Sequence, residues 1–344
     1  MMPRTFLRAV LVLALVAFPL VANDFWVQQI GGRTLGLGTI ALSLVFLAAH
    51  GGMLSLGQMA LAGVAGYTVA YVMAPVAGMA VHLPLAAALP LALVLATVAG
   101  LLVGLIAVRT SGIYTLMLTL AIAMGFYYLA LQNYALFNGF TGFTQVEAPT
   151  VAGMSFAAPR AFYGLCLAAA FGCYGLVTYL ATTPFGLAMQ AARDNPRRLR
   201  ALGYHIASLR VAAFGVGGFI AGIGGVLSLW LNGSISPGSI ALVPTIDVLM
   251  AAVLGGLGHP IGAYVGALLF VIVQNFAIDF VDRERFNTLI GLIFLGVVLF
   301  SPDGVVGLVR RLRARLSPTP RKTGRAGATT ADAAVGRQPA NDKI

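Results

Sequence analysis

The sequence predicts an all-α polytopic membrane protein, and three observations lead to this fold class. Of the 344 residues, 59% are hydrophobic and only 9% are charged, whereas soluble domains carry roughly 25% charged residues. The apolar residues form long runs, such as LPLAAALPLALVLATVAGLLVGLIAV from Leu83 to Val108, and about 20 apolar residues cross the bilayer core as a helix. The runs lack the alternation of apolar and polar residues that marks membrane β-strands.

Apolar segments between polar or Gly/Pro breaks predict about ten transmembrane helices, several of them short for a full crossing. Glycine spacing within two of the segments, at Gly63 and Gly66 and at Gly100 and Gly104, predicts close helix packing. The expected spans are 5–22, 34–50, 54–74, 84–108, 113–133, 160–181, 209–230, 243–258, 261–280 and 286–302.

The arginines predict the orientation. With a cytoplasmic N-terminus, seventeen of the 21 basic residues fall on the cytoplasmic side, as the positive-inside rule requires. We therefore expect a multi-pass protein of the bacterial inner (plasma) membrane with both termini in the cytoplasm. The net charge of +11 is then explained by topology and by attraction to anionic membrane lipid, without nucleic acid. The exceptions are Arg33, Arg160, Arg283 and Arg285.

Two domains are expected. Residues 1–316 form the transmembrane domain, and residues 317–344, rich in Ala, Thr, Pro, Gly and Arg without apolar periodicity, form a disordered basic cytoplasmic tail. The first segment also has the basic start, apolar core and small residues near Ala22 that are typical of a secretory signal. Cleavage of that segment is the alternative, and it leaves the remaining topology unchanged.

A basic loop, residues 182–208, separates two of the spans. Asn195 followed by Pro196 predicts a helix start, and Gly203 predicts its end. Leu199 and Leu202 are expected to share an apolar face of this short helix. Such a helix is suited to dock on a partner or to lie on the membrane surface. The alternative is that the arginines serve only to fix the topology. The loop and the start of the next span carry Arg193, Arg197, Arg198, Arg200 and Arg210 against Asp194.

The loop and the following span read TPFGLAMQAARDNPRRLRALGYHIASLRVAAFGVGGFIAGIGGVLSL. This segment resembles the loop and next helix of LivM-type permeases, the membrane subunits of ABC importers for branched-chain amino acids. The resemblance covers about residues 35–310. It continues, in the family's order, in AAHGGMLSLGQMALAGVAGYTVA, SGIYTLMLTLAIAMGFYYLAL, IDVLMAAVLGGLGHPIGAYVGALLF and NTLIGLIFLGVVLFSPDGVVGL.

The resemblance implies an ABC importer permease fold and a set of partners. These are ABC ATPase subunits that bind ATP-Mg, a second LivH-like permease subunit and an extracytoplasmic solute-binding protein. The loop is then the ATPase-coupling element, although PRRLR at residues 196–200 departs from the family's more acidic version and leaves open which ATPase binds. The chain itself has no G-x-x-x-x-G-K-[ST] motif. The positions carried over are Ala191, Ala192, Arg193, Asp194, Asn195 and Gly203.

Polar residues within apolar spans are candidates for a translocation pathway. Asp247 lies near the outer end of its span, where a carboxylate within reach of interfacial water is the alternative. His50 and His259 each lie at a glycine-rich break, which predicts either a tight turn or a broken helix whose backbone lines a pathway. Gln58 is expected either to form interhelical hydrogen bonds or to line the pathway. No metal site and no catalytic constellation is expected, and the chain is not predicted to be an enzyme.

The predicted function is a permease subunit of an ATP-driven importer. The expected solutes are branched-chain amino acids or a related small polar solute such as urea or an amide. The alternative is a secondary transporter driven by an ion gradient, which needs intramembrane titratable groups and finds almost none apart from Asp247. A third hypothesis is a scaffold protein without transport activity, and no feature of the sequence favours it. The outer segment at residues 137–153 departs from the family and leaves the solute open.

Overall fold

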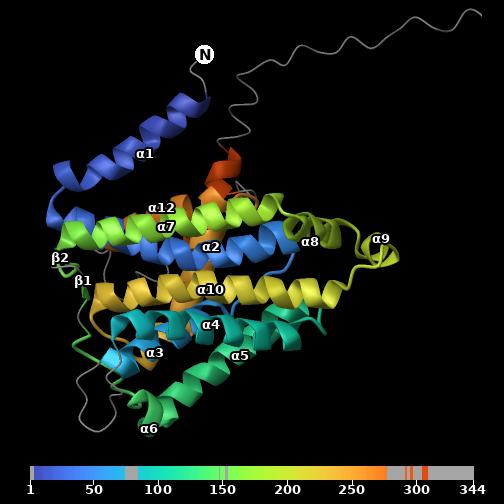
Figure 1. Cartoon of the computed structure of the whole chain (residues 1–344), viewed down its shortest axis with the longest axis horizontal. Helices are drawn as coiled ribbons and strands as arrows, with labels where there is room; N and C mark the ends of the chain where they lie inside the picture. Colours follow the sequence, from blue (N-terminus) through green and yellow to red (C-terminus); the bar gives the residue numbers. More distant parts are fainter. Residues whose placement is uncertain are drawn as a thin grey trace, which may run out of the picture. The chain divides into compact units, whose positions relative to one another are not determined.

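The computed structural model describes residues 4–73, 84–146, 148–151, 154–276, 291–292, 295–296 and 304–308. These residues belong to one compact unit, Met1–Val309 (Figure 1). The tail at 317–344 and almost all of the expected span 286–302 lie outside them. The long elements are α1 Arg4–Val21, η1 Trp26–Gly32, α2 Arg33–Gly51, α3 Gln58–Met73, α4 Leu85–Ala107, α5 Ile113–Gln132, α7 Pro159–Thr182, α10 Ile206–Asn232, α11 Leu242–Gly255 and α12 Pro260–Phe276.

The chain is an all-α, multi-pass membrane protein. Six helices in the described part are long and apolar enough to cross a membrane, and α3 and α12 are shorter apolar helices. The short elements are α6 Tyr134–Phe137, α8 Pro184–Asp194, α9 Pro196–Ala201, the 3-10 turn η2 Pro237–Ile240, and the two-residue strands β1 Thr150–Val151 and β2 Met154–Ser155, which pair antiparallel.

Most helix bounds lie within a few residues of the expected spans, with two differences. The span expected at 34–50 is the end of one 26-residue helix, Trp26–Gly51, because Arg33 lies half-buried inside the helix and does not interrupt it. The span expected at 54–74 becomes helical only at Gln58. Gly52 stops the preceding helix in a left-handed conformation, with φ +62°, and the chain continues without helical structure to residue 57.

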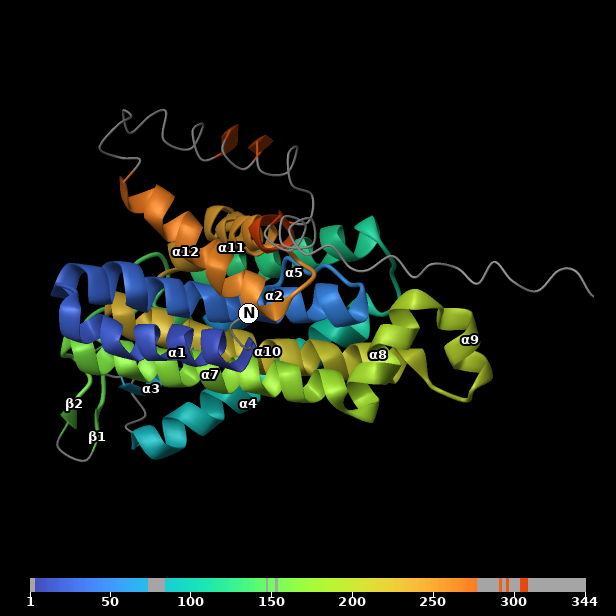
Figure 2. The same cartoon turned by 90° about the horizontal axis from the view of Figure 1, so that it is seen from above.

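α2 is the central helix of the bundle. It packs against α7, α10, α11 and α12. The membrane span that ends with α2 is 78% buried, whereas the spans formed by α4 and α5 are only 28% and 22% buried. Figures 1 and 2 show α2 lying between its neighbours along most of its length. Because α4 and α5 are at least as apolar as α2 yet largely exposed, their outer faces are suited to lipid or to another membrane subunit.

α10 packs against α3 and α4 through glycines, as the glycine spacing predicts. A Cβ placed on Gly225 of α10 would lie 2.0 Å from the Ala62 carbonyl oxygen of α3. On α4, a Cβ on Gly100 would lie 2.5 Å from the Phe214 carbonyl oxygen of α10. Glycine at these positions lets two helix backbones meet directly, which is how membrane helices gain packing energy when lipid supplies no hydrophobic drive.

We expect Gly225→Val to destabilise the bundle, because the new side chain collides with the backbone of α3. Overpacking of this kind costs about 1–3 kcal/mol or more. Gly172→Val is the matched control, since Gly172 also lies inside a helix but has no atom within 4 Å of its added Cβ. Thermal unfolding of both variants in detergent measures the difference. Equal melting temperatures would contradict the close α3–α10 contact.

Candidate functional site

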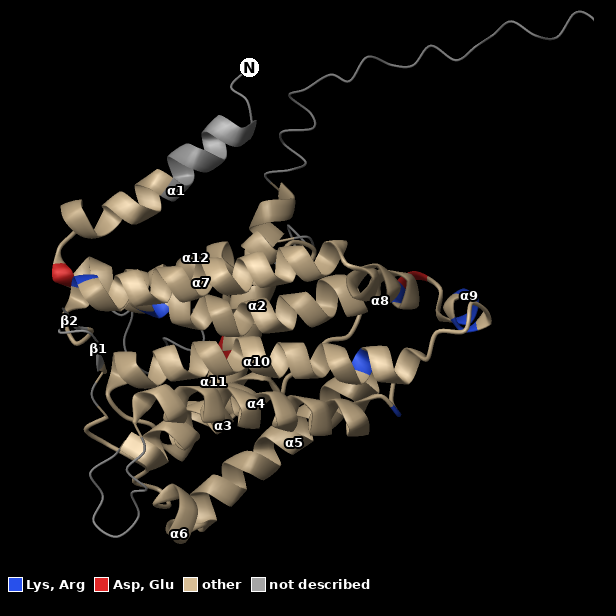
Figure 3. Cartoon of the chain, viewed as in Figure 1, with Lys and Arg blue, Asp and Glu red and all other residues tan. Residues whose placement is uncertain are grey.

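One end of the bundle is strongly basic. Arginines gather on α8 and α9 (Figure 3), and both of these helices extend past the ends of the long helices (Figures 1 and 2). We call this the basic end. The loop helix α9 begins as predicted, because the Asn195 side chain accepts the Arg198 N–H at 3.1 Å. Gly203 follows the helix with φ +86°, a conformation that favours glycine.

The basic end exposes large apolar side chains as well as charge. Leu187, Leu202 and Tyr204 are 57%, 70% and 48% exposed. The expected common face of Leu199 and Leu202 is not formed: Leu199 is buried, whereas Leu202 lies at the C-cap of α9 and turns outward. An exposed apolar cluster beside arginines is typical of a protein-binding surface.

The six loop positions fall into two groups. Asn195 and Gly203 shape α9, whereas Ala191 to Asp194 form the last turn of α8. Within that turn Ala191 is exposed and Ala192 is buried, so the two alanines face different ways and only Ala191 is open to a partner. Arg193 and Asp194 form an ion pair, with Nε and Oδ1 3.0 Å apart.

Arg193 fastens the loop to the central helix. Its guanidinium donates to the Ala49 carbonyl in the last turn of α2, and its side chain packs beside Gly52, where an added Cβ would lie 2.5 Å from Arg193 Cγ. The last carbonyls of a helix have no partner within it, and a cation is favourable there. On the same side, the Met189 side chain approaches Gly51. The basic loop is therefore attached directly to the end of α2.

The structure brings Arg193 and His259 near His50. His50 is in the last turn of α2, is buried, and lies within electrostatic reach of both Arg193 and His259. Its Nδ1 is 3.3 Å from the Phe46 carbonyl oxygen. His259 is exposed, and its Nδ1 accepts the Ile261 N–H at 3.3 Å, so it caps α12. The break at His259 is a tight turn between α11 and α12.

The break after His50 is different, because it leads into the bundle. Residues 53–57, the buried segment, are non-helical, and Ser55 is fully buried. The Leu56 N–H donates to Thr119 Oγ1 of α5 at 3.0 Å, and the Gly57 N–H donates to Ser55 Oγ at 3.2 Å. Irregular backbone at membrane depth is tolerated only inside protein or along a cavity. Of the two alternatives expected for the break after His50, the structure has the broken helix and not the tight turn.

Gln58, the first residue of α3, is 1% exposed. Its Oε1 lies 2.9 Å from Ser43 Oγ of α2, and the single hydroxyl hydrogen of Ser43 is shared between this oxygen and the Ile40 carbonyl oxygen, which is 2.6 Å away. The Gln58 amide nitrogen, Nε2, is buried with no hydrogen-bond partner among the described residues. A buried unpaired donor costs about 1–3 kcal/mol. Gln58 therefore forms the expected interhelical hydrogen bond and keeps one unused donor.

Asp247 belongs to another part of the bundle. It is half-buried on α11, and its electrostatic partner is Arg33 on α2, although no ion pair within 4.0 Å joins these two described residues. No hydrogen bond or ion pair recorded for the described residues links it to His50, Gln58 or His259. The four pathway candidates thus do not form one site.

Sequence reasoning missed the hydroxyls of Ser43, Ser55 and Thr119. The structure places them around the buried segment and the start of α3. Hydroxyls in membrane helices commonly bond to a carbonyl of their own helix, as Thr119 also does to Thr115. No pattern in the sequence separates the hydroxyls that serve another segment from those that serve only their own helix.

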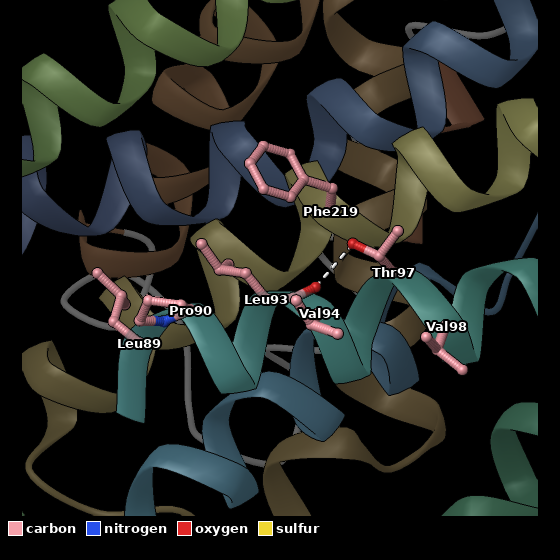
Figure 4. Close-up of a pocket in the computed structure, with 7 residues that line it drawn as sticks. All are labelled: Leu89, Pro90, Leu93, Val94, Thr97, Val98 and Phe219. Atoms are coloured by element: carbon pink, nitrogen blue, oxygen red, sulfur yellow. Dashed lines mark hydrogen bonds between the residues drawn. The ribbon is translucent and has the colours of Figure 1, made fainter. Parts of the chain in front are cut away.

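An apolar groove runs along α4 (Figure 4). Of its lining residues, Thr97 carries the side-chain hydroxyl, and this hydroxyl donates to the Leu93 carbonyl at 2.7 Å. The groove therefore offers no free polar group to a small polar solute and suits an acyl chain or an apolar helix face. Its lining residues are Leu89, Pro90, Leu93, Val94, Thr97, Val98 and Phe219.

Comparison with known proteins places these features in a family. The family described as branched-chain amino acid transport system / permease component matches residues 29–300. The high-affinity branched-chain amino acid transport system permease protein LivM of Escherichia coli (strain K12) is 26% identical over 89% of this chain and 76% of its own length. BraD, the permease protein of the same description in Pseudomonas aeruginosa, is 32% identical over 39% of this chain and 43% of its own length.

A second Escherichia coli (strain K12) protein, the high-affinity branched-chain amino acid transport system permease protein LivH, also resembles the chain. It is 26% identical over 38% of this chain and 42% of its own length. The chain thus resembles two permease proteins of the same description from one organism. No solved structure matches the chain.

We expect Gln58→Met to stabilise the protein, because it removes the unpaired Nε2 while the Ser43 hydroxyl keeps the Ile40 carbonyl as acceptor. The gain is about 1 kcal/mol. Gln190→Met is the control, since the Gln190 Nε2 donates to the Ala181 carbonyl at 3.3 Å and its loss stabilises nothing. Thermal unfolding of both variants compares them with the parent chain. A fall in stability for Gln58→Met alone would show that its hydrogen bond to Ser43 outweighs the unpaired donor.

Proposed function

The chain belongs to the family of permease components of branched-chain amino acid transport systems, of the LivM type, and we propose that it is the membrane-spanning subunit of an ATP-driven ABC importer. The observation that carries the proposal is the basic end. There an exposed apolar and cationic surface is attached through Arg193 to the central helix α2. A surface that binds a partner and is tied to the core of the bundle can pass a partner's motion to the spans.

The partner proposed for the basic end is an ABC ATPase. Leu202 and Tyr204 are exposed on the basic loop, and contact with another protein would bury their apolar area. The arginines of α9 suit an acidic rim around such an apolar contact. ATP-Mg would bind to the ATPase, because this sequence holds no phosphate-binding motif of its own. The basic end then faces the cytoplasm, in agreement with the positive-inside rule.

The proposed path of coupling runs from α8 through Arg193 to the end of α2. Arg193 touches both the Ala49 carbonyl and the Gly52 turn, and Gly52 leads into the buried segment and α3. A displacement of α8 therefore reaches two elements at once: the helix at the centre of the bundle and the non-helical chain within it. Movement of packed helices past one another is a common form of such transitions.

We further propose leucine, isoleucine and valine as the first candidate solutes, with urea and amides as the alternative class. The amino acids are supported by the similarity of the chain to branched-chain amino acid permeases. A second, LivH-like permease subunit and an extracytoplasmic binding protein would complete the importer. A secondary transporter would depend on Asp247 as its titratable group; Arg33 lies within electrostatic reach of this carboxylate, with no ion pair within 4.0 Å between these two described residues.

Leu202→Asp should separate the chain from its ATPase, because it places a carboxylate in the apolar part of the docking surface. Loss of one buried contact at an interface centre weakens binding by about 2 kcal/mol or more. Leu136→Asp is the control, since Leu136 is 53% exposed on α6, outside the basic loop. Co-purification of the ATPase with each variant from detergent-solubilised membranes gives the result. Retention of the ATPase by Leu202→Asp would refute this docking surface.

Arg193→Met should leave the ATPase bound but reduce uptake for each ATP hydrolysed, because it removes the attachment to Ala49. Arg109→Met is the control and keeps the coupling, since Arg109 is exposed and lies outside the basic loop. Uptake and hydrolysis are measured together in vesicles that contain the whole importer and a loaded binding protein. Uptake that continues without ATP and stops when the ion gradient is collapsed would replace the importer with a secondary transporter.

A further inference from the structure

α3 begins inside the bundle and not at its end. Its first residue, Gln58, accepts a hydrogen bond from Ser43, which lies eight residues before the end of α2 at Gly51. At 1.5 Å per residue, this places the start of α3 about 12 Å inside the end of the central helix. The buried segment carries the chain to that depth, and both Ser55 and Gln58 are almost completely buried there.

The start of α3 presents unused backbone donors. The first turn of a helix leaves N–H groups without a partner, and in α3 the Leu61 N–H is the one that reaches back to the Gly57 carbonyl, at 3.0 Å. Within the described ranges, no side chain accepts from the N–H groups of Gln58, Met59 or Ala60. These N–H groups lie at the N-terminal end of α3, which is the positive end of the helix dipole. They therefore favour the binding of an anion.

A second donor lies at the same place. The Gln58 Nε2 is buried and unpartnered in the part of the chain that the structure describes, while Oε1 of the same amide is held by Ser43. The side chain is 1% exposed. The hydrogen-bond partners around it are hydroxyls and backbone groups, with no carboxylate among them. A buried cluster that offers donors and no negative charge is complementary to a carboxylate.

The α10 residue opposite this cluster has no side chain that would cover it. Gly217 of α10 faces Gln58, and a Cβ added to Gly217 would lie 3.6 Å from Gln58 Oε1 and 3.5 Å from Leu47 Cδ1. These are ordinary contact distances, so glycine here is not required by a collision. Because the close α3–α10 contact resists separation, a shift of α10 along its own axis is the movement that would uncover the amide.

We propose that the first turn of α3, with the Gln58 amide, binds the carboxylate of the transported solute about 12 Å inside the end of α2. The proposal rests on the transport function proposed above and narrows its solutes to those that carry a free carboxylate, so it disfavours urea and neutral amides. It also gives the coupling path an end point, since the buried segment joins the Gly52 turn, which Arg193 contacts, to this site.

The test uses Gln58→Cys and Gly217→Cys in the complete importer, reconstituted with its ATPase, second permease subunit and binding protein. The parent chain is the background, because Cys166 and Cys173 are both buried. Each variant reacts with an anionic sulfonatoethyl and a cationic trimethylammonioethyl methanethiosulfonate, in resting, ATP-bound and vanadate-trapped states. Rates are normalised to each reagent's reaction with a free thiol.

We expect the anionic reagent to react at least about tenfold faster in one of these states, because the helix start favours negative charge. Leucine should slow the reaction, and leucinamide, which lacks the carboxylate, should not. Equal rates for the two reagents, equal protection by both solutes, or no reaction in any state would each overturn the carboxylate site. The importer proposal is judged separately, by ATP-dependent leucine uptake in the parent chain.

Discussion

Every backbone N–H and C=O surrounded by lipid must find its partner within the protein, and the arrangement of this bundle depends on that constraint. Long helices meet it by themselves, but the chain between α2 and α3 does not. There the side chains of Ser55 and Thr119 supply acceptors to the backbone, and the Gly52 and Met53 N–H groups bond back to the end of α2. The non-helical chain can therefore lie within the bundle because α2, α5 and Ser55 of the segment itself supply acceptors to its N–H groups.

The same constraint explains why the loop helix matters. The last carbonyls of α2 need donors from outside the helix, and Arg193 supplies one to Ala49 from α8. A group that satisfies a helix end also ties two parts of the molecule together. The basic end is thus both an exposed surface and a structural part of the central helix, which is why a partner bound to the former can act on the latter.

Local patterns predicted much of this fold, and non-local contacts set the limit. The spans and the caps of α9 at Asn195 and Gly203 follow from neighbouring residues, so the sequence predicted them. The burial of Ala192 depends on the packing of α8 against other helices, and the Ser43–Gln58 bond depends on how α2 and α3 pack across the break between them. Apolar periodicity gave no help, because lipid and protein core both accept apolar residues. The apolar segments of α2 and α4 both predict membrane spans, yet 78% of the first span and 28% of the second are buried.

The glycine-lined face of α10 has a mechanical consequence. Where backbone rests on backbone, as at Gly225 and Ala62, few side chains interlock across the contact, and sliding along the helix axis meets little steric resistance. Separation of the same helices remains costly, because the contact is so close. The contact therefore resists separation of α3 and α10 more strongly than it resists sliding of one helix along the other.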